Sequence, residues 1–235
     1  MSDETYAQRR RILVRSLIAN GILRFPEVIR AMETVPREKF VPKEYGGAAY
    51  VDTPLPIGEG QTISAPHMVA IMTEALELTE GLKVLEIGAG CGYSAAILCE
   101  VIAPKESTRP GHLYTMEIVP QLFELAKGNL EALSRKDHAT TILGDGSLGY
   151  PEAAPYDRIV VTAAAPRILE ILLDQLAKPG IMVSPVGTTY YGQELIKVRK
   201  DEEGKISSTS LGGVVFVPLV GREGWKGYRI GGHTV

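Results

Sequence analysis

The stretch that most constrains the fold is residues 83–96, KVLEIGAGCGYSAA. An apolar run that includes Val84 and Leu85 is followed at once by three glycines, and a helix is expected from Tyr93 onward. Glycines at such a turn allow a positive φ and let a ligand approach a main chain that carries no side chains. The pattern predicts a strand, a tight turn and a helix, with a ligand site at the carboxyl end of the strand.

The spacing of the glycines indicates the kind of ligand. A dinucleotide fingerprint reads G-x-G-x-x-G, and here Tyr93 stands where the third glycine would be, which disfavours a nicotinamide or flavin cofactor. The observed E-x-G-x-G-x-G, from Glu86 to Gly92, resembles the first motif of Rossmann-like methyltransferases that use S-adenosylmethionine. An acidic residue suits a cofactor whose head carries an ammonium and a sulfonium. The alternative is a tight turn without a ligand, because short glycine-rich turns recur in α/β proteins.

Composition disfavours several function classes. The 235 residues suffice for one large domain, and the net charge of −3 gives no basic footprint for nucleic acid. No apolar run approaches the ~20 residues of a membrane span. The start, MSDETYAQRRR, lacks the apolar core of a signal peptide. We therefore expect a cytoplasmic monomer without a nucleic-acid or membrane partner, and we interpret the basic run at residues 9–11 as a solvated helix face.

Neither a disulfide nor a metal site is expected. Cys91 and Cys99 are eight positions apart on one predicted helix, a separation of about 12 Å that a disulfide does not reach. A cysteine near a helix N-terminus can have a lowered thiol pKa, but we prefer to interpret Cys91 as a small turn residue. The histidines show no metal-ligand spacing; they are His67, His112, His138 and His233.

The first part of the chain is predicted to face a substrate. Residues 5–34 show helical spacing that is interrupted around Gly21 and Pro26. Residues 35–64 are rich in Pro and Gly and show no periodicity that would support a long element. Their aromatic and aliphatic residues argue for packing rather than disorder, and a long ordered loop is usually functional. This segment is therefore a candidate for substrate contact.

Ser64 stands directly before a predicted helix, and one interpretation makes it the helix cap. Pro66, however, favours the first helical position, and the residue before a proline is biased to extended geometry. In that register Ala65 is the cap and the Ser64 hydroxyl is free to face a ligand. Both interpretations stay open on the residues alone. His67 would lie in the first turn, where a packed or surface position is as compatible with the pattern as a ligand contact.

Two further acidic residues close the next predicted strands. Glu117 follows a strand at residues 113–116, where a carboxylate can accept hydrogen bonds from a pair of ribose hydroxyls. Asp145 follows a strand at residues 140–143, where it can accept from an adenine amino group. The alternatives are a surface glutamate and a common Asp-Gly turn. Their order along the chain favours the cofactor interpretation, because Glu86, Glu117 and Asp145 each stand at the end of one of three successive predicted strands.

The remaining segments complete an α/β pattern. They predict a helix at residues 168–176 and strands at residues 156–162, 181–186, 194–200, 205–211 and 214–220. The expected fold class is α/β: the Rossmann-like, doubly wound fold of S-adenosylmethionine-dependent methyltransferases. To it we add an N-terminal helical extension and C-terminal antiparallel strands. We expect one structural unit, in which residues 1–78 pack on a core at residues 79–235.

Several motifs together resemble the protein-L-isoaspartate O-methyltransferase family over nearly the whole chain. They are VPREKFVP at residues 35–42, PLPIGEGQTISAPHM at 54–68, VLEIGAGCGYSAA at 84–96, GDGSLGYPEAAPYDRIVVTAAAP at 144–166 and FVPLVG at 216–221. The resemblance implies methyl transfer from S-adenosylmethionine to the free α-carboxylate of L-isoaspartyl residues in damaged proteins and peptides. The ester then collapses to a succinimide, which begins repair.

The resemblance also implies roles for individual residues. Ser64 would be the active-site residue near the substrate carboxylate, together with substrate contacts at Thr62, Ile63 and His67. The cofactor would be held by Glu86, Gly88, Ala89, Gly90, Glu117, Asp145 and Gly146. The sequence departs from the family pattern at Ala89 and Cys91, where hydroxylated residues are common, and in a longer loop at residues 104–112. That loop leaves the register of Glu117 less well defined.

The expected chemistry is consistent with a site that has no general base. A carboxylate with a pKa near 4 is already ionised at neutral pH, so it can attack a methyl group directly. The contribution of the protein would then be to hold the reacting atoms in line. Two rival interpretations are a methyltransferase of the same fold that acts on a small molecule or RNA, and a non-catalytic protein that binds S-adenosylmethionine.

Overall fold

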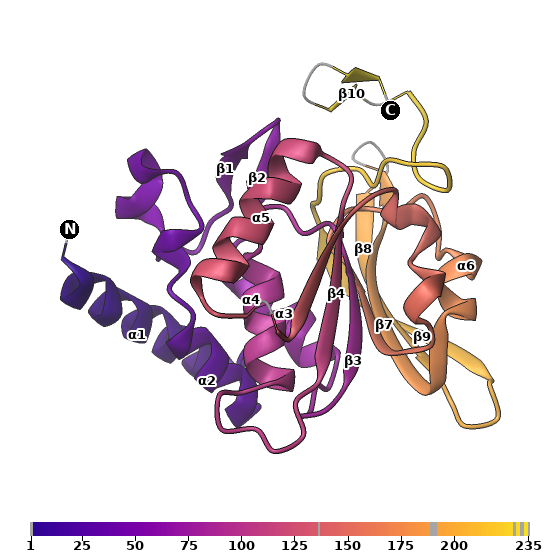
Figure 1. Cartoon of the computed structure of the whole chain (residues 1–235), viewed down its shortest axis with the longest axis horizontal. Coiled ribbons are helices and arrows are strands. Elements are labelled where there is room, and N and C mark those ends of the chain that lie inside the picture. Colours follow the sequence, from indigo (N-terminus) through magenta and orange to yellow (C-terminus); the bar gives the residue numbers. More distant parts are fainter. Residues whose placement is uncertain (1, 136, 189–191, 228, 231–232, 235) are drawn as a thin grey trace.

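A seven-stranded sheet with the order β5-β4-β3-β6-β7-β8-β9 forms the centre of the computed structural model (Figure 1). The structure describes residues 2–135, 137–188, 192–227, 229–230 and 233–234. The strands of this sheet are β3 Lys83–Ile87, β4 His112–Glu117, β5 Ala139–Leu143, β6 Tyr156–Val161, β7 Leu176–Thr188, β8 Gly192–Lys200 and β9 Ile206–Val214. A short pair, β10 Arg229–Ile230 and β11 His233–Thr234, lies outside it.

The strand order reverses beside β3. From β3 the chain proceeds outward to β4 and β5, and it then returns to add β6 and β7 on the other side, all in parallel. The last two strands, β8 and β9, are antiparallel. A reversal of this kind leaves a crevice at the carboxyl ends of the two central strands, which is where doubly wound sheets bind ligands. The predicted α/β doubly wound fold with antiparallel C-terminal strands is confirmed.

Helices cover both faces of the sheet and divide the core into two layers. Figure 1 shows α3 Pro66–Ala75, α4 Tyr93–Ile102 and α5 Pro120–Ala132 on one side, and α6 Glu170–Asp174 on the other. Neighbouring residues of β3 point in opposite directions: Val84 joins the core cluster under α4, whereas Leu85 joins the cluster that contains Leu172 of α6. No helix within the described ranges is long and apolar enough to span a membrane.

The N-terminal part confirms one prediction and adds a short hairpin. The helices α1 Asp3–Ala19 and α2 Pro26–Thr34 match the predicted break near Gly21 and Pro26. Two 3-10 turns follow, η1 Arg37–Lys39 and η2 Lys43–Ala48. No long element was expected in residues 35–64, and none is described there, but the segment contains a short hairpin that was not predicted from the sequence, formed by β1 Leu55–Gly58 and β2 Gln61–Ile63. The chain reverses within GEG, which contains two glycines at positive φ.

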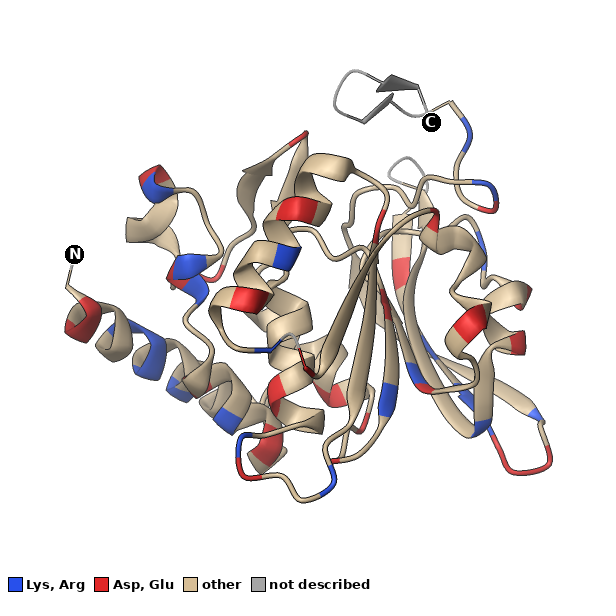
Figure 2. Ribbon diagram, in the orientation of Figure 1, with Lys and Arg blue, Asp and Glu red and all other residues tan. Residues whose placement is uncertain are grey.

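Charged positions are spread over the ribbon, with basic residues prominent on α1 (Figure 2). Two of the three arginines at residues 9–11 are more than a solvated face. Arg9 donates a hydrogen bond to the carbonyl of Gly47, and Arg10 donates one to the hydroxyl of Tyr50. These arginines therefore fasten α1 to the segment that contains η2.

Three predicted elements in the second half of the chain differ from the structure. The helix expected at residues 168–176 is only α6, because Gln175 caps it and Leu176 already begins β7. The observed strand β7 is correspondingly longer than the strand expected at residues 181–186. The strand expected at residues 214–220 is wrong: after Val214 the chain leaves the sheet and makes only isolated bridges at Pro218 and Val220. It crosses above the carboxyl ends of the strands instead.

Candidate functional site

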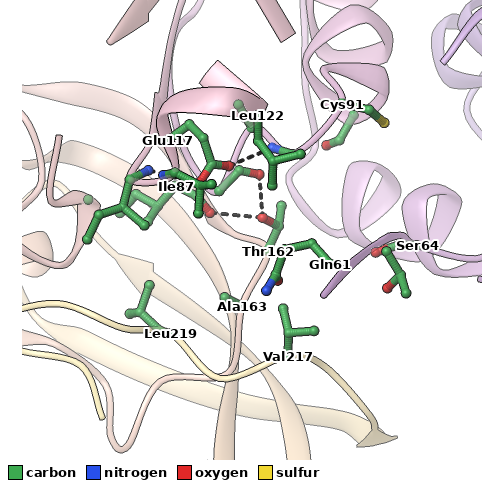
Figure 3. A pocket seen from close by; sticks show the side chains of 18 of the residues that line it. Gln61, Ser64, Ile87, Cys91, Glu117, Leu122, Thr162, Ala163, Val217 and Leu219 are labelled. Carbon is green, nitrogen blue, oxygen red and sulfur yellow. Dashed lines mark hydrogen bonds between the residues drawn. The ribbon is translucent and has the colours of Figure 1, made fainter. Parts of the chain in front are cut away.

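A pocket opens at the point where the strand order reverses (Figure 3). Its walls come from β2 and α3, from the glycine-rich loop after β3, from the ends of β4 and β6, and from the crossing segment after β9. The lining residues are Gln61, Thr62, Ile63, Ser64, Val69, Ile87, Gly88, Ala89, Gly90, Cys91, Tyr93, Ser94, Met116, Glu117, Ile118, Val119, Leu122, Gly146, Thr162, Ala163, Val217, Pro218, Leu219 and Val220. The site predicted at the end of the first core strand is therefore a real cavity.

The glycine-rich loop is held against the neighbouring strand β6. Gly88 has a φ of 97°, and a Cβ at this position would lie 2.3 Å from Thr162 Oγ1. The position of that hydroxyl is fixed by two carbonyl oxygens. It lies 2.6 Å from the carbonyl oxygen of Gly88 and 2.9 Å from that of Ile87. Glycine is required at this position both for its backbone conformation and for lack of space.

Glu117 connects the end of β4 to the same loop. One of its oxygens, Oε2, accepts a hydrogen bond from the Gly90 amide at 2.8 Å. The other, Oε1, accepts from the amides of Ile118 at 2.9 Å and Val119 at 3.0 Å. The carboxylate lines the pocket and keeps about one acceptor position free, because its two oxygens offer about four and the three amides take three of them. It therefore orders the loop and can still accept a hydrogen bond from a ligand hydroxyl.

Glu86 lies behind the pocket rather than in its wall. It is fully buried between β3 and α4, where Thr115 Oγ1 donates to its Oε2 at 2.6 Å, and its Oε1 has no hydrogen-bond partner within the described residues. Burial raises the pKa of Glu86 to about 7, although hydrogen bonds from Ser94 and Thr115 oppose the shift. Ser94 itself lines the pocket, so Glu86 can act on a ligand through the neighbouring hydroxyl and through its charge.

The raised pKa of Glu86 predicts how stability depends on pH. Because the pKa is about 7 in the folded chain against an ordinary value of 4.5, the unfolded chain loses this proton first as the pH rises. Glu86 should therefore cost up to about 3 kcal/mol of stability above pH 7 and nothing below pH 4. We expect Glu86→Gln to stabilise the ligand-free protein at pH 8 but not at pH 4. Urea unfolding over this range tests it, with Glu124→Gln on exposed α5 as control. The prediction would be contradicted if the free energies of unfolding of Glu86→Gln and the native protein differed by the same amount at every pH.

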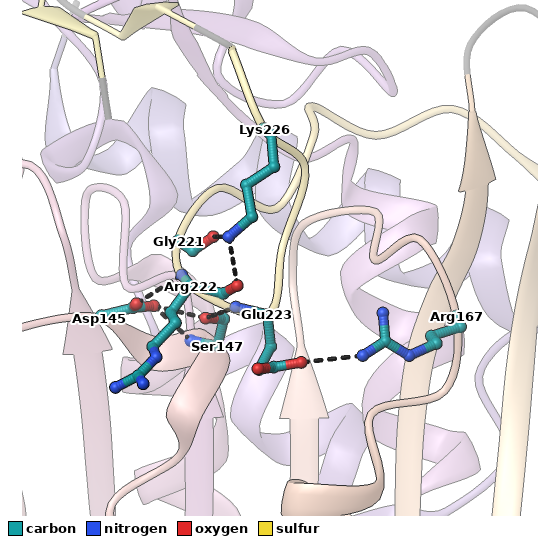
Figure 4. Close-up of polar contacts among 7 residues, drawn as sticks. All are labelled: Asp145, Ser147, Arg167, Gly221, Arg222, Glu223 and Lys226. Carbon is teal, nitrogen blue, oxygen red and sulfur yellow. Dashed lines mark hydrogen bonds and ion pairs between the residues drawn. The ribbon is translucent and has the colours of Figure 1, made fainter.

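Asp145 is engaged by the segment that crosses the sheet (Figure 4). Its Oδ1 accepts from the Ser147 amide and hydroxyl at 2.9 and 2.6 Å, and its Oδ2 accepts from the Arg222 amide at 2.7 Å. Ser147 Oγ in turn accepts from the amide of Glu223 at 2.9 Å. The side chain of Asp145 does not line the pocket, whereas the next residue, Gly146, does. Asp145 thus fixes the pocket wall formed by residues 217–220, and its predicted contact with a cofactor stays a prediction.

The structure decides between the two interpretations of the helix that follows Ser64. Ala65 is the N-cap of α3 and Pro66 occupies the first turn, so the Ser64 side chain is not a helix cap. Ser64 lines the pocket with Thr62 and Ile63, and in Figure 3 it lies on the wall across from Glu117. The hydroxyl is therefore available to a ligand, as the alternative register predicted.

His67 lies outside the pocket lining. Its backbone amide donates to Asp52 Oδ1 at 2.9 Å, and its ring Nδ1 lies 2.9 Å from the same oxygen. Asp52 thereby supplies the side-chain acceptor that Ala65 does not provide at the start of α3. The predicted substrate contact of His67 remains untested, and its observed role is to fix the helix that follows Ser64.

Several pocket residues were not singled out from the sequence. Thr162 and Ala163 lie at the end of the strand predicted at residues 156–162, where the pattern indicates an element rather than a contact. Tyr93 and Ser94 open the helix after the glycines, where the pattern predicts an element rather than a contact. Residues 217–220 were assigned to a strand, which hid their role as a wall. Cys91 lines the pocket but is buried, and burial raises the pKa of its thiol to about 11, which supports the small turn residue interpretation.

Comparisons with known proteins agree with one another. The sequence profile of a family described as protein-L-isoaspartate(D-aspartate) O-methyltransferase matches residues 8–224. The protein-L-isoaspartate O-methyltransferase of Hyperthermus butylicus is 54% identical over 229 residues, which cover 97% of this chain and 95% of the relative. The corresponding protein of Methanothermobacter thermautotrophicus is 51% identical over 217 residues, or 92% and 97% of the two chains.

Two solved structures show the same arrangement. A protein-L-isoaspartate O-methyltransferase superimposes with a TM-score of 0.78 at 28% identity, covering 91% of this chain and 66% of its own. A protein from Plasmodium falciparum, described as a putative member of this group in complex with S-adenosyl-L-homocysteine, superimposes with a TM-score of 0.77. It is 27% identical, and the match covers 90% of this chain and 98% of the Plasmodium chain.

Proposed function

The chain belongs to the protein-L-isoaspartate(D-aspartate) O-methyltransferase family, and on that premise we propose how its own residues carry the reaction. The enzyme transfers a methyl group from S-adenosylmethionine to the free α-carboxylate of L-isoaspartyl residues in damaged proteins and peptides. The observation that carries the assignment of residues is the pocket, which brings Ser64 of the substrate-facing segment to the glycine-rich loop after β3.

The residues around the loop fit the cofactor. Gly88 and Gly90 have no side chains beyond the main chain, and the Glu117 carboxylate that lines the pocket has about one acceptor position left for a ribose hydroxyl. Glu86 places a buried acidic group behind the loop, and one of its oxygens has no partner among the described residues, as expected beside a cationic ligand. Gly146 gives access along the backbone after β5. When bound, S-adenosylmethionine supplies the methyl group that is transferred.

The reaction requires orientation rather than proton transfer. The substrate carboxylate is ionised at neutral pH, so the protein needs to supply no base. We assign to the Ser64 hydroxyl the role of a donor that holds one carboxylate oxygen, leaving the other to attack. Thr62 and Ile63 line the same wall and form the approach for the substrate chain. The main contribution of the site is therefore proximity and alignment.

Removal of the Ser64 hydroxyl should separate catalysis from cofactor binding. We expect Ser64→Ala to lower kcat about tenfold to a hundredfold, because one hydrogen bond that orients the reacting oxygen is lost. The affinity for S-adenosylhomocysteine should stay within about twofold, since the side chain is not a helix cap and the fold does not depend on it. Steady-state kinetics and calorimetry measure the two effects, with Ser16→Ala on the exposed side of α1 as control. Equal losses of turnover and cofactor binding would contradict the assignment.

A pair of peptides tests the function itself. The two have the same sequence, but one contains L-isoaspartate and the other aspartate, and each is incubated with S-adenosylmethionine. We expect mass spectrometry to find a base-labile methyl ester on the isoaspartyl peptide alone. Modification of neither peptide, with cofactor binding intact, would favour another substrate or a non-catalytic binding role.

We also propose that residues 1–78 and 79–235 form one structural unit. A single hydrophobic cluster supports this, because it takes Leu17 and Met32 from the first segment and Ile97 and Leu113 from the second. The net charge of −3 supports proteins and peptides, rather than nucleic acids, as partners.

A further inference from the structure

Arg37 is a fully buried cation that lies against the main chain of Ser64, one of the residues that line the pocket. It lies in η1, within the VPREKFVP segment, and 0% of its surface is exposed. Its Nη2 donates to the carbonyl of Ser64 at 2.8 Å, and its Nε donates to the carbonyl of Ala49 at 2.9 Å. The guanidinium carbon lies 4.9 Å from the centre of the Tyr93 ring. One side chain therefore contacts two residues that line the pocket, Ser64 and Tyr93.

The charge of Arg37 has no partner of opposite charge in the part of the chain that the structure describes. None of the ion pairs there includes this guanidinium, and its buried Nη1 has no hydrogen-bond partner. Asp52 contributes only a weak attraction and is itself bonded to His67. Burial lowers the pKa of Arg37, but a guanidinium with an ordinary pKa above 12 still stays charged.

A buried charge of this kind lowers the stability of the fold, so its presence beside Ser64 suggests a role in the site. A buried ion without a counter-charge costs several kcal/mol, and two carbonyls and an aromatic face return only part of that. An apolar side chain could fill this volume at lower cost. The guanidinium lies against the main chain of the residue whose hydroxyl faces the ligand. A carboxylate placed at Ser64 would supply the missing negative charge, and in a low-dielectric site the attraction would be substantial.

We infer that Arg37 is a positioning residue that fixes the main chain of Ser64 and, through its uncompensated positive charge, selects a carboxylate at that point of the pocket. The inference rests on the proposed function, in which the substrate brings an α-carboxylate to Ser64. The cofactor also has a carboxylate, on its amino-acid end, so the experiment has to distinguish the two sources.

The test compares the binding of two peptides in the presence of S-adenosylhomocysteine. One contains an isoaspartyl residue with its free α-carboxylate, and the other has the neutral α-carboxamide at the same position. We expect the native enzyme to bind the carboxylate about tenfold more tightly and Arg37→Met to lose most of that preference. Binding of S-adenosylhomocysteine alone should change less than about threefold. A purely structural role would weaken both peptides equally and leave their ratio unchanged.

Two further variants keep the result interpretable. Arg37→Lys retains the charge but cannot reach both carbonyls, so we expect a preserved preference with kcat lowered about tenfold. Arg158→Met is the control: Arg158 also donates to main-chain carbonyls, those of Leu76, Asp157 and Glu77, but at the opposite end of the sheet. It should lower stability without changing the ratio of the two peptide affinities.

Three outcomes would overturn the inference. An unchanged ratio in Arg37→Met would remove the selection of a carboxylate. Loss of the preference for the carboxylate peptide in Arg37→Lys would also contradict the selection of a carboxylate. This preference can be measured in Arg37→Lys even if Arg37→Met does not fold. A selective loss of S-adenosylhomocysteine binding would assign the charge to the cofactor instead. Failure of the proposed function is a separate result, because the native enzyme would then form no ester on the isoaspartyl peptide.

Discussion

Replacement of Gly88 by alanine should weaken S-adenosylmethionine binding at least about a hundredfold and destabilise the protein by about 2 to 4 kcal/mol. The new Cβ would lie 2.3 Å from Thr162 Oγ1, and the residue would have to hold a φ of 97°. Thr162 cannot turn away without giving up its hydrogen bonds to the carbonyls of Ile87 and Gly88. The loop itself must therefore move out of the pocket wall. Calorimetric titration and urea unfolding measure the two effects.

A second substitution separates the two causes. In Gly88→Ala with Thr162→Ala the close oxygen is gone, and the nearest remaining side-chain contact is the residue 162 Cβ at 3.6 Å. We expect the double variant to recover part of the stability but to keep the cost of the positive φ. Gly128→Ala is the matched control, because a Cβ there meets nothing within 4 Å and α5 favours alanine by about 1 kcal/mol. If Gly88→Ala bound S-adenosylmethionine with the native affinity, the glycine-rich loop after β3 would not be part of the cofactor site.

Loss of the Glu117 carboxylate should have an effect of similar size. Glu117→Ala leaves the amides of Gly90, Ile118 and Val119 without their acceptor and removes the proposed partner of a ribose hydroxyl. Hydrogen bonds to charged groups contribute about 1.5 to 3 kcal/mol each, so we expect cofactor affinity to fall about a hundredfold or more. The drop should appear in calorimetric titration with S-adenosylhomocysteine.

The conservative variant gives a graded result. Glu117→Gln keeps one acceptor oxygen but turns an N–H₂ group toward a backbone amide, so the loss should be about tenfold. Glu124→Ala on the exposed face of α5 should bind normally. If Glu117→Gln and Glu117→Ala both bound the cofactor as the native enzyme does, Glu117 would have only a structural role at the end of β4.

The sequence was sufficient to predict the core of the fold and the position of the site. The apolar runs before Gly88 and Glu117 mark buried parallel strands, the run before Asp145 marks the partly exposed edge strand β5, and parallel strands place their carboxyl ends at one edge. These two rules bring distant residues together without any knowledge of side-chain packing. Pro66 favoured the register that frees Ser64, because proline constrains both its own backbone and that of the residue before it, but the residues alone left the cap interpretation open until the structure decided.

The parts that could not be predicted depend on contacts between distant segments. The β1–β2 hairpin is too short for a periodic signal, although GEG between apolar residues is compatible with a hairpin turn. Residues 214–220 have the composition of a strand, yet Pro218 has no N–H and the segment bonds to Ala164 above the sheet. Similarly, the buried position of Arg37 follows from the carbonyls of Ala49 and Ser64, which no local pattern reveals.

The segment that Asp145 and Ser147 fasten across the sheet has a consequence for the order in which the enzyme becomes active. The wall at residues 217–220 is made after the other walls of the pocket, since synthesis proceeds from the N-terminus. A growing chain that ends before Arg222 has the glycine-rich loop and Ser64 but lacks the amides that Asp145 and Ser147 accept from. The wall at residues 217–220 then lacks its bonds to Asp145 and Ser147, so we expect the pocket to be complete only when the chain extends past Glu223.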